Sequence, residues 1–463
     1  MQYAMQNSAM VALLVATSMS ESMSEKYTVV IGFGSTGKSV IHFLLSQGID
    51  VVSMDSREQP PGMEEFSQAL PQLDIHVGGL DEALLLAADR IIVSPGISLL
   101  QPEIQAAMHQ GVEIIGDIEL FARNCHRPVI AVTGSNGKST VVTLVSDMAK
   151  AAGIRVGLGG NIGTPALDLL REDYALYVLE LSSFQLETLE SLTPAACVVL
   201  NVSEDHMDRY DSFSHYKDTK QRIYQHCQWA VVNKDESEVA NMDTGASQMM
   251  KYSLEQPDQN EFGVCESEQG AMLCFGNECL MPVAELGLKG RHNVSNALAS
   301  LALGNACGFD RQAMIETLRS FRGLPHRCQW VRTHNLVDWY DDSKGTNVGA
   351  TLAALQGIAA EKIVLIAGGI AKDADLSPLK GAVSRFARSV VLIGQDAALI
   401  EQAIDGAVAV YHAVDMDAAV KLAADLAQPG DAVLLSPACA SFDMFRNYQH
   451  RGEVFVNAVE SLV

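Results

Sequence analysis

Short apolar runs that alternate with helical patterns constrain the fold of this chain more than any other feature. Most of these runs are continuous rather than alternating between apolar and polar residues, and Gly, Ser or Asn follows most of them. Continuous runs are typical of strands buried on both faces, and their alternation with helices indicates βαβ units and parallel sheets. We therefore predict an α/β fold whose ligands bind beyond the carboxyl ends of the strands. The expected strands are residues 27–31, 50–54, 91–93, 129–132, 176–179, 196–202, 363–367, 389–393 and 432–435.

The length of 463 residues suggests about three domains rather than one. We predict domains at residues 24–116, 117–323 and 324–463, preceded by a poorly ordered extension over residues 1–23. The first and last domains are expected to be Rossmann-like. The central domain is expected to resemble a P-loop ATPase domain with a small antiparallel sheet, because residues 225–290 become shorter in pattern and more polar.

The composition excludes some partners. A formal net charge of −24 argues against a general nucleic-acid or anionic-membrane binder, which would need a basic surface. No apolar run reaches the roughly 18 residues of a membrane span. The nine cysteines are an odd number without a C-x-x-C motif, which favours reduced thiols in a cytoplasmic protein. Any anionic ligand must therefore be held by local backbone N–H groups, particular basic side chains or a metal.

A glycine-rich turn at residues 133–140 (Thr-Gly-Ser-Asn-Gly-Lys-Ser-Thr) lies between an expected buried strand and an expected helix over 139–152. Gly134 and Gly137 let the backbone N–H groups face an anion, and the helix N-terminus adds positive potential. Lys138 would reach the β- and γ-phosphates of a nucleotide, and Ser139 could bind Mg²⁺. The structural alternative is a tight turn with Lys138 in solvent, but that leaves the Lys-Ser-Thr triplet without a packing reason.

Acidic residues follow the next two expected strands. Glu180 ends the strand at 176–179, where a carboxylate beside a phosphate loop can bind Mg²⁺ directly or through water. Residues 203–208 (Ser-Glu-Asp-His-Met-Asp) follow the strand at 196–202. Alone, this cluster would be a solvated turn, but its position near Glu180 and Lys138 favours a role at the site.

A second glycine-rich turn, residues 32–39, satisfies the phosphate-loop pattern G-x-x-x-x-G-K-[ST], which the turn at 133–140 fails because residue 132 is Val. The turn also reads as G-x-G-x-x-G, and Asp55 lies about 20 residues further on, where the ribose partner of a Rossmann fold belongs. This dinucleotide-like interpretation explains four residues, whereas the phosphate-loop interpretation adds only Lys38. We therefore expect the turn to bind a pyrophosphate, with Lys38 incidental or an outer phosphate contact.

The chain resembles the Mur ligase family from about residue 27 to its C-terminus. The motifs that carry this resemblance are residues 116–121, 133–140, 159–163, 179–187, 201–210, 290–296, 324–327, 342–344 and 435–441. Within the family, the resemblance implies ATP-dependent addition of D-glutamate to UDP-N-acetylmuramoyl-L-alanine through an acyl phosphate, with two Mg²⁺ ions. It also implies a cytoplasmic monomer with small-molecule partners only.

The resemblance assigns roles residue by residue. The residues implied to contact ATP are Gly134, Ser135, Asn136, Gly137, Lys138, Ser139, Thr140, Asn293, Asn296, Arg327, Asp342 and Lys344. Those implied to contact the UDP substrate are Ser35, Thr36, Asp55, Ser56, Arg57, Ser94, Gly96, Asn161 and His206. Those implied to hold D-glutamate are Thr346, Lys372, Ser441 and Tyr448. The implied metal ligands are Ser139, Glu180, His206 and a carbamylated Lys220. The implied catalytic residues are Lys138, Asn161, His206 and Lys220.

Two positions and three rival functions stay open at this point. Without the resemblance, Lys220 would be read as an ordinary solvated lysine on a surface helix, and Lys38 departs from the uncharged residue usual in the family. A folylpolyglutamate-synthase-like ligase would share the central loop but is not expected to carry the first domain. A NAD-dependent dehydrogenase would explain the first turn but leave Lys138 and Glu180 without a role. A non-catalytic nucleotide-binding regulator would bind ATP without turnover.

Overall fold

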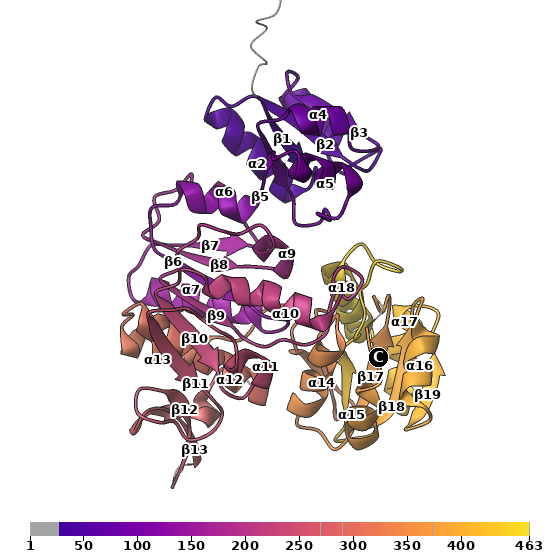
Figure 1. Cartoon of the computed structure of the whole chain (residues 1–463). Helices are drawn as coiled ribbons and strands as arrows, with labels where there is room; N and C mark the ends of the chain where they lie inside the picture. Colours follow the sequence, from indigo (N-terminus) through magenta and orange to yellow (C-terminus); the bar gives the residue numbers. More distant parts are fainter. Residues whose placement is uncertain (1–26, 269, 289, 373, 463) are drawn as a thin grey trace, which may run out of the picture. The chain divides into compact units, whose positions relative to one another are not determined.

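The computed structural model describes residues 27–268, 270–288, 290–372 and 374–462 (Figure 1). The described residues form two compact units, which divide between Arg123 and Asn124. Three sheets of five, nine and six strands lie within the three predicted blocks, which confirms the α/β class. The exact domain boundaries stay predictions, and the expected extension at 1–23 lies outside the described residues.

The first unit is built on a parallel sheet with strand order β3-β2-β1-β4-β5. Its strands are β1 (Thr28–Ile31), β2 (Val51–Asp55), β3 (Asp74–Val77), β4 (Arg90–Val93) and β5 (Glu113–Gly116). Its helices are α2 (Ser35–Ser46), α3 (Met63–Ala69), α4 (Glu82–Ala87), α5 (Pro102–His109) and α6 (Asp117–Asn124), the last residue of which begins the second unit. The three strands expected here from continuous apolar runs are confirmed, since β1 and β4 are almost completely buried along their length.

The second unit begins with a nine-stranded sheet of order β14-β13-β12-β11-β10-β9-β6-β8-β7. Its strands are β6 (Val129–Thr133), β7 (Val156–Gly160), β8 (Leu176–Glu180), β9 (Ala196–Val199), β10 (Trp229–Asn233), β11 (Gln248–Tyr252), β12 (Phe262–Ser267), β13 (Gly270–Phe275) and β14 (Glu278–Pro282). The expected antiparallel strands are β12, β13 and β14, but they extend this sheet rather than form a separate one. The same expectation was wrong for β10 and β11, which pair in parallel.

Helices pack against the nine-stranded sheet along its length. They are α7 (Lys138–Ala151), α8 (Ala166–Leu169), α9 (Ser183–Leu186), α10 (Phe213–Gln221), α11 (Ser237–Ala240), α12 (Arg291–Ala306) and α13 (Arg311–Ser320), with 3₁₀ turns at Arg222–Tyr224 and Val283–Glu285. The expected helix at 139–152 is confirmed as α7, which packs against β6, β7 and β8 and against α12. Its apolar residues recur at helical spacing, and Val141, Val145 and Met148 are fully buried. Each such side chain stabilises the fold by roughly 1.5–3 kcal/mol, which fixes the N-terminus of α7 at the sheet edge.

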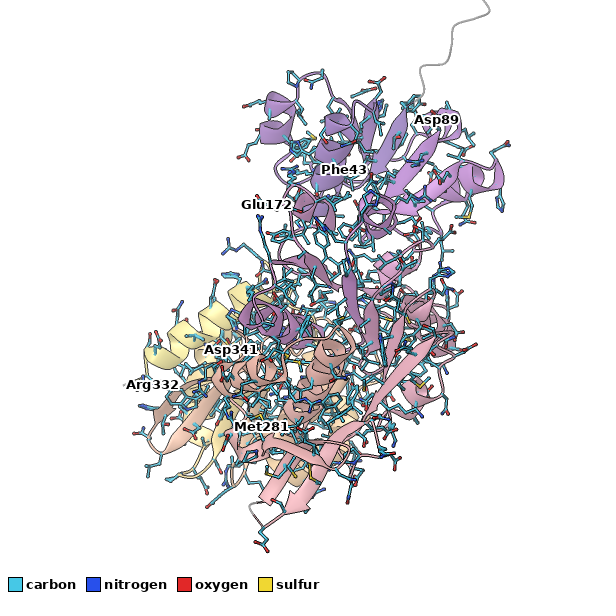
Figure 2. All side chains as sticks on the ribbon, turned by 90° about the vertical axis from the view of Figure 1, so that its left-hand side faces the viewer. Phe43, Asp89, Glu172, Met281, Arg332 and Asp341 are labelled. Atoms are coloured by element: carbon cyan, nitrogen blue, oxygen red, sulfur yellow. A yellow bond between two sulfur atoms is a disulfide. The ribbon has the colours of Figure 1, made fainter. Side chains whose placement is uncertain are left out.

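The second unit ends with a six-stranded sheet of order β15-β16-β20-β17-β18-β19, in which only the pairing of β15 with β16 is antiparallel. Its strands are β15 (Gln329–His334), β16 (Val337–Asp341), β17 (Ile363–Gly368), β18 (Ala387–Ile393), β19 (Ala409–His412) and β20 (Ala432–Leu435). Its helices are α14 (Val348–Gly357), α15 (Leu379–Phe386), α16 (Ala397–Ile404), α17 (Met416–Leu426) and α18 (Tyr448–Glu460). Figure 2 shows the side chains that fill the spaces between ribbons, with Asp341 labelled at the end of β16.

The structure bears on two expectations from the composition, namely the absence of a membrane span and the reduced state of the cysteines. In the parts of the chain that the structure describes, no helix has both the length and the apolar character needed to cross a membrane. The expectation of reduced thiols was wrong for Cys265 and Cys274, which form a disulfide. The hairpin of β12 and β13 brings their Cα atoms to 6.5 Å, within the usual range for a disulfide.

Candidate active site

The turn between β6 and α7 has the backbone form of a phosphate loop. Gly134 and Gly137 have φ values of 145° and 84°, which L side chains rarely adopt. A Cβ atom on Gly137 would lie 2.5 Å from Asn296 Oδ1, so the loop is also sterically closed to larger residues. Asn201, which follows β9, stabilises the loop, because its Oδ1 accepts a hydrogen bond from Asn136 N at 2.8 Å. The strand–turn–helix geometry expected for this stretch is therefore confirmed.

Lys138 lies at the first position of α7 and turns back over the loop. Its Nζ donates to Gly134 O at 2.7 Å and to Ser135 O at 3.0 Å. Although the residue as a whole is half-buried, its ammonium group is enclosed, and burial lowers its pKa against the opposing effect of Glu180. The alternative with Lys138 free in solvent is wrong, since this cation is held inside the loop.

Glu180 ends β8, beside β6, and is 3% exposed. Its Oε2 accepts from Ser139 Oγ at 2.6 Å and its Oε1 accepts from Asn161 Nδ2 at 2.9 Å. Burial would raise the pKa of this carboxyl, but the charge of Lys138 and the two hydrogen bonds outweigh it and lower the pKa. Arg327 also donates to Ser139 Oγ, at 2.6 Å. The site therefore holds a buried, charged carboxylate beside a hydroxyl and a guanidinium.

Lys220 lies on α10, as expected, but it does not face solvent. It is 2% exposed, and its Nζ donates to Gly134 O at 3.1 Å and lies 4.5 Å from the centre of the Tyr216 ring. Burial, together with the nearby charge of Lys138, lowers its pKa well below the ordinary value. The interpretation of Lys220 as a solvated surface lysine is therefore wrong, because α10 presents this residue to the phosphate loop.

The acidic cluster at 203–208 is not a solvated turn, because Asp205 is buried and bonded to the last domain. Its Oδ1 accepts from Lys372 Nζ at 2.6 Å, and its Oδ2 accepts from Asn347 Nδ2 at 3.2 Å. Burial would raise the pKa of Asp205, but the charge of Lys372, together with the hydrogen bonds from Lys372 and Asn347, outweighs burial and lowers the pKa to about 2. Burial lowers the pKa of the neighbouring His206 imidazole, which favours its neutral form.

One cavity, of about 390 Å³, opens on the side of the phosphate loop that faces α12. This volume falls in the range of small-molecule sites. The expected ATP contacts that line it are Asn136, Gly137, Thr140, Asn293, Asn296, Arg327, Asp342 and Lys344. Burial raises the pKa of Asp342 to about 7, and burial with the charges of Arg327 and Lys138 lowers that of Lys344 to about 8.

A second cavity, of about 470 Å³, adjoins the first, since both are lined by Asn136, Gly137, Arg327 and Lys344. The expected catalytic and metal-binding residues that line it are Lys138, Asn161, Glu180, His206 and Lys220. All four residues expected to hold D-glutamate also line it, namely Thr346, Lys372, Ser441 and Tyr448. Residues that follow strands of two sheets of one unit thus line these two adjoining cavities.

The first glycine-rich turn, between β1 and α2, is held by Asp55 at the end of β2. Asp55 Oδ2 accepts from Phe33 N at 2.7 Å and from Arg57 Nη2 at 2.7 Å, so this carboxylate supports the turn itself. Burial would raise its pKa, but hydrogen bonds from Arg57 and Phe33 lower it. The Arg57 side chain is 52% exposed. Five other expected substrate contacts, Ser35, Thr36, Ser56, Ser94 and Gly96, follow strands at the same edge of the five-stranded sheet, whereas Asn161 and His206 line the second cavity of the other unit.

Lys38 has a structural explanation in this turn. Its Nζ donates to Pro61 O at 3.0 Å and to Gly62 O at 3.1 Å, across the segment that follows β2. The same Nζ lies 5.0 Å from the centre of the Phe33 ring and 5.5 Å from that of Phe66. Lys38 therefore links α2 to the segment before α3. These contacts give the side chain a structural role that does not require a bound phosphate.

Comparisons with known proteins decide the family. Residues 26–116, 132–304 and 326–439 match, in turn, the Mur ligase MurD-like N-terminal domain, the Mur ligase middle domain and the Mur ligase, glutamate ligase domain. A protein of Pseudomonas syringae pv. tomato named UDP-N-acetylmuramoylalanine–D-glutamate ligase is 49% identical over 447 residues, which cover 96% of this chain and 100% of that protein. The chain belongs to the Mur ligase family.

Other Mur ligases agree with this assignment. A protein from Pseudomonas aeruginosa with the same name is 49% identical over 442 residues, covering 95% of this chain and 99% of that protein. The solved structure of UDP-N-acetylmuramate-alanine ligase MurC from Thermotoga maritima matches with a TM-score of 0.59 at 19% identity, over 94% of this chain and 99% of that one. MurF from Acinetobacter baumannii matches with a TM-score of 0.56 at 16% identity, over 94% and 92%. At these low identities, the two structures support the Mur ligase fold and nothing more specific.

Some residues of this Mur ligase site were not expected from the sequence. Asp205, Asn347 and Tyr216 all line the second cavity, and Asn347 Nδ2 donates both to Asp205 Oδ2 and to Asn136 Oδ1. Asp205 lay within the acidic cluster, but no local pattern singles it out from Glu204 or Asp208. A signal for Asn347 did exist, because it precedes α14 and caps it by accepting from Ala350 N.

Proposed function

We propose that this Mur ligase is an ATP-dependent amide ligase that joins D-glutamate to UDP-N-acetylmuramoyl-L-alanine in peptidoglycan precursor synthesis. The observation that carries the proposal is the convergence of Lys138, Ser139 and Glu180 at one buried sheet edge. The chain is also 49% identical to ligases with that name. A monomer that acts in the cytoplasm stays a prediction from the sequence.

The charges of the two cavities suit three anionic substrates. Lys138, Lys344, Arg327, Lys220 and Lys372 line them in a chain whose net charge is −24. Preorganised cations stabilise charge that develops on a transferred phosphoryl group, and they act more strongly where water is excluded. The adenine and ribose would occupy the cavity beside Asn293 and Asn296, and the phosphates would lie along the loop between the two cavities.

The reaction has two chemical steps. An alanyl carboxylate oxygen attacks the γ-phosphorus of ATP, the bond from that phosphorus to ADP breaks, and an acyl phosphate forms. The amine of D-glutamate then attacks the acyl carbon, the amine loses a proton, and phosphate leaves with the oxygen it gained. Lys138 and Arg327 would hold the transferred phosphoryl group, and Lys372, Thr346 and Ser441 would orient D-glutamate.

The donors at the sheet edge fit magnesium. Ser139 and Glu180 offer oxygen atoms, which Mg²⁺ prefers, and the Glu180 carboxylate is kept ionised by Lys138 and two hydrogen bonds. We assign Ser139 and Glu180 to a first ion and His206 with a carbamylated Lys220 to a second. When bound, the ions would offset the negative charge of the phosphate oxygens.

The surroundings of Lys220 favour a carbamate. An amine adds to carbon dioxide only in its neutral form, and burial of Lys220 favours that form. The carbamate would replace a buried positive charge beside Lys138 by a negative one, which would then attract both Lys138 and a cation. We expect Lys220→Ala to lose most activity and to regain part of it with an added short carboxylate. The matched control is Lys217→Ala on the same helix, whose Nζ pairs with Glu238, and it should keep full activity. Full activity in Lys220→Ala would refute this role.

The substrate assignment is tested by phosphate release from ATP with each acceptor and amino acid in turn. UDP-N-acetylmuramoyl-L-alanine with D-glutamate should give turnover, and the same acceptor with L-glutamate, L-lysine or meso-diaminopimelate should not. Turnover with a folate and L-glutamate, and none with the first pair, would instead establish the folylpolyglutamate-synthase-like alternative.

A further inference from the structure

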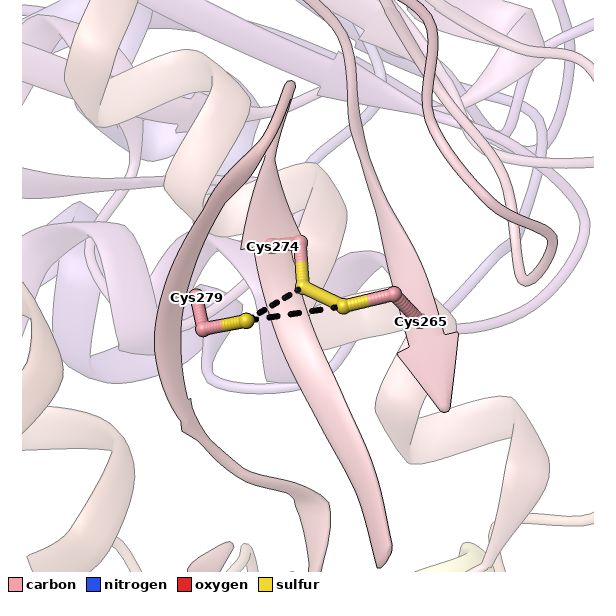
Figure 3. A group of neighbouring side chains, drawn as sticks. All are labelled: Cys265, Cys274 and Cys279. Carbon is pink, nitrogen blue, oxygen red and sulfur yellow. Dashed lines mark hydrogen bonds between the residues drawn. A yellow bond between two sulfur atoms is a disulfide. The ribbon is translucent and has the colours of Figure 1, made fainter. Parts of the chain in front are cut away.

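Three cysteines from three adjacent strands meet on the antiparallel part of the nine-stranded sheet, away from the residues that line the two cavities. Cys265 lies on β12, Cys274 on β13 and Cys279 on β14. Figure 3 shows their side chains directed toward one another. Among the residues that the structure describes, they are the one group of three or more His, Cys, Asp or Glu side chains whose ligand atoms all lie within 4.8 Å of one another.

The sheet itself brings these residues together. A β-bulge between Leu273 and Cys274 shifts the register of β13 and β14, so that Cys274 lies directly opposite Cys279. Cys265 comes from the other side of Cys274, since β12 and β13 are also antiparallel neighbours. Cys274 is fully buried, whereas Cys279 is exposed and gives the group access to solvent. The neighbouring Leu273 and Met281 pack in the core and fix both strands, and Met281 is labelled in Figure 2.

The position of Cys279 suits a shared cation better than exchange with the disulfide. Its Sγ lies 3.7 Å from Cys265 Sγ and 3.7 Å from Cys274 Sγ. An attacking thiolate must approach along the extension of a sulfur–sulfur bond, but a sulfur equally far from both partners lies beside that bond. Metal–thiolate bonds of about 2.3 Å separate two sulfurs of a tetrahedral site by about 3.8 Å. Cys279 Sγ therefore already lies at the distance from Cys265 and Cys274 that a tetrahedral metal site requires. Reduction of the disulfide would supply the other two thiolate ligands.

We propose that Cys265, Cys274 and Cys279 form a binding site for one soft, thiophilic metal cation when the disulfide is reduced. A dithiol reductant supplies two electrons and two protons, so the Cys265–Cys274 bond breaks and the reductant becomes a disulfide. Three thiols then lose their protons to solvent as three sulfur–metal bonds form. Thiolates select soft cations, and Mg²⁺ does not compete because it prefers oxygen. A chain with the Cys265–Cys274 disulfide cannot bind the cation through these two residues, and a metal-bound chain cannot form the disulfide.

The site is tested with Cd²⁺ as the probe, on the full chain, in the presence of excess Mg²⁺. Protein reduced and then freed of reductant without air should bind one Cd²⁺ per chain, seen as ultraviolet thiolate-to-metal absorption. Protein oxidised with glutathione disulfide should not show this absorption. Cys279→Ser should lower the affinity of the reduced protein by about tenfold or more, because it removes one ligand and keeps the other pair.

Two controls keep the outcome interpretable. Cys125→Ser removes a free cysteine elsewhere and should bind Cd²⁺ as the parent does. Unchanged D-glutamate-dependent phosphate release would show that Cys279→Ser is folded, because this residue lies outside both cavities. The proposal is overturned if the reduced parent binds no Cd²⁺ in excess Mg²⁺, or if Cys279→Ser binds it with equal affinity and absorption.

Discussion

Lys138 and Lys38 allow a matched test, because each follows a glycine-rich turn and each is changed to alanine in the same way. Lys138 has its ammonium group inside the loop that borders both cavities, next to Glu180 and Ser139. Lys38 contacts Pro61 O, Gly62 O and the rings of Phe33 and Phe66, all within the first unit. Lys138→Ala should therefore lower kcat strongly and leave the fold unchanged. Lys38→Ala should instead lower the stability of the fold and leave kcat nearly unchanged.

The contacts that each lysine makes determine how much activity or stability its removal should cost. Removing one preorganised donor from an oxyanion site costs about 2.7–4 kcal/mol, a factor of 10²–10³ in kcat, and a buried cation belongs at the upper end of that range. Lys38→Ala loses a cation–π contact worth about 0.5–1 kcal/mol at an exposed site and hydrogen bonds worth about 1 kcal/mol net. A loss of about 2 kcal/mol leaves a folded domain, so kcat should stay within about twofold.

Steady-state phosphate release with saturating UDP-N-acetylmuramoyl-L-alanine and D-glutamate measures both effects. We expect Lys138→Ala to lower kcat by about 10³, with an unchanged circular dichroism spectrum. Lys38→Ala should lower the unfolding temperature and change mainly the KM for the UDP substrate. The assignment of the two turns is refuted if Lys38→Ala abolishes turnover and Lys138→Ala is mild.

Two further predictions concern cations in the cavities. Since the pKa of Lys344 is lowered to about 8, its charge is lost as pH rises through that value, and kcat/KM for ATP should fall above it. In Lys344→Arg the decline should move well above pH 8, and an unchanged profile would exclude Lys344 as the group responsible. Lys372→Ala should raise the KM for D-glutamate about thirtyfold, from about 2 kcal/mol of lost charged hydrogen bonding, with a smaller change in kcat. The control Lys380→Ala removes an exposed pair with Asp405 and should change neither constant; an unchanged KM in Lys372→Ala would contradict the role.

The strands and both turns were predictable because their signals are local. The buried strand before residue 134, the glycines and the helical spacing after Lys138 all lie within about 25 residues of one another. The same holds for Asp55, whose place at the end of β2 follows from one apolar run. Local patterns of this kind depend on backbone geometry and on burial at the strand and helix periods, which the sequence records directly.

The burial of Lys220 could not be predicted from its surroundings in the sequence. Its helix is polar and reads as a surface helix, and the contact that encloses its ammonium group comes from Gly134, 86 residues earlier. Asp205 meets Lys372 from 167 residues away. The disulfide of Cys265 and Cys274 depends on the pairing of β12 and β13, which composition does not record.

The most direct test of the central claim follows one oxygen atom through the reaction. UDP-N-acetylmuramoyl-L-alanine labelled with ¹⁸O in the alanyl carboxylate is incubated with ATP, D-glutamate and the enzyme, and the phosphate is analysed by mass spectrometry. Ligation through an acyl phosphate predicts one ¹⁸O atom in each phosphate released and one labelled oxygen fewer in the peptide product. Unlabelled phosphate, with amide formation at the normal rate, would contradict the account.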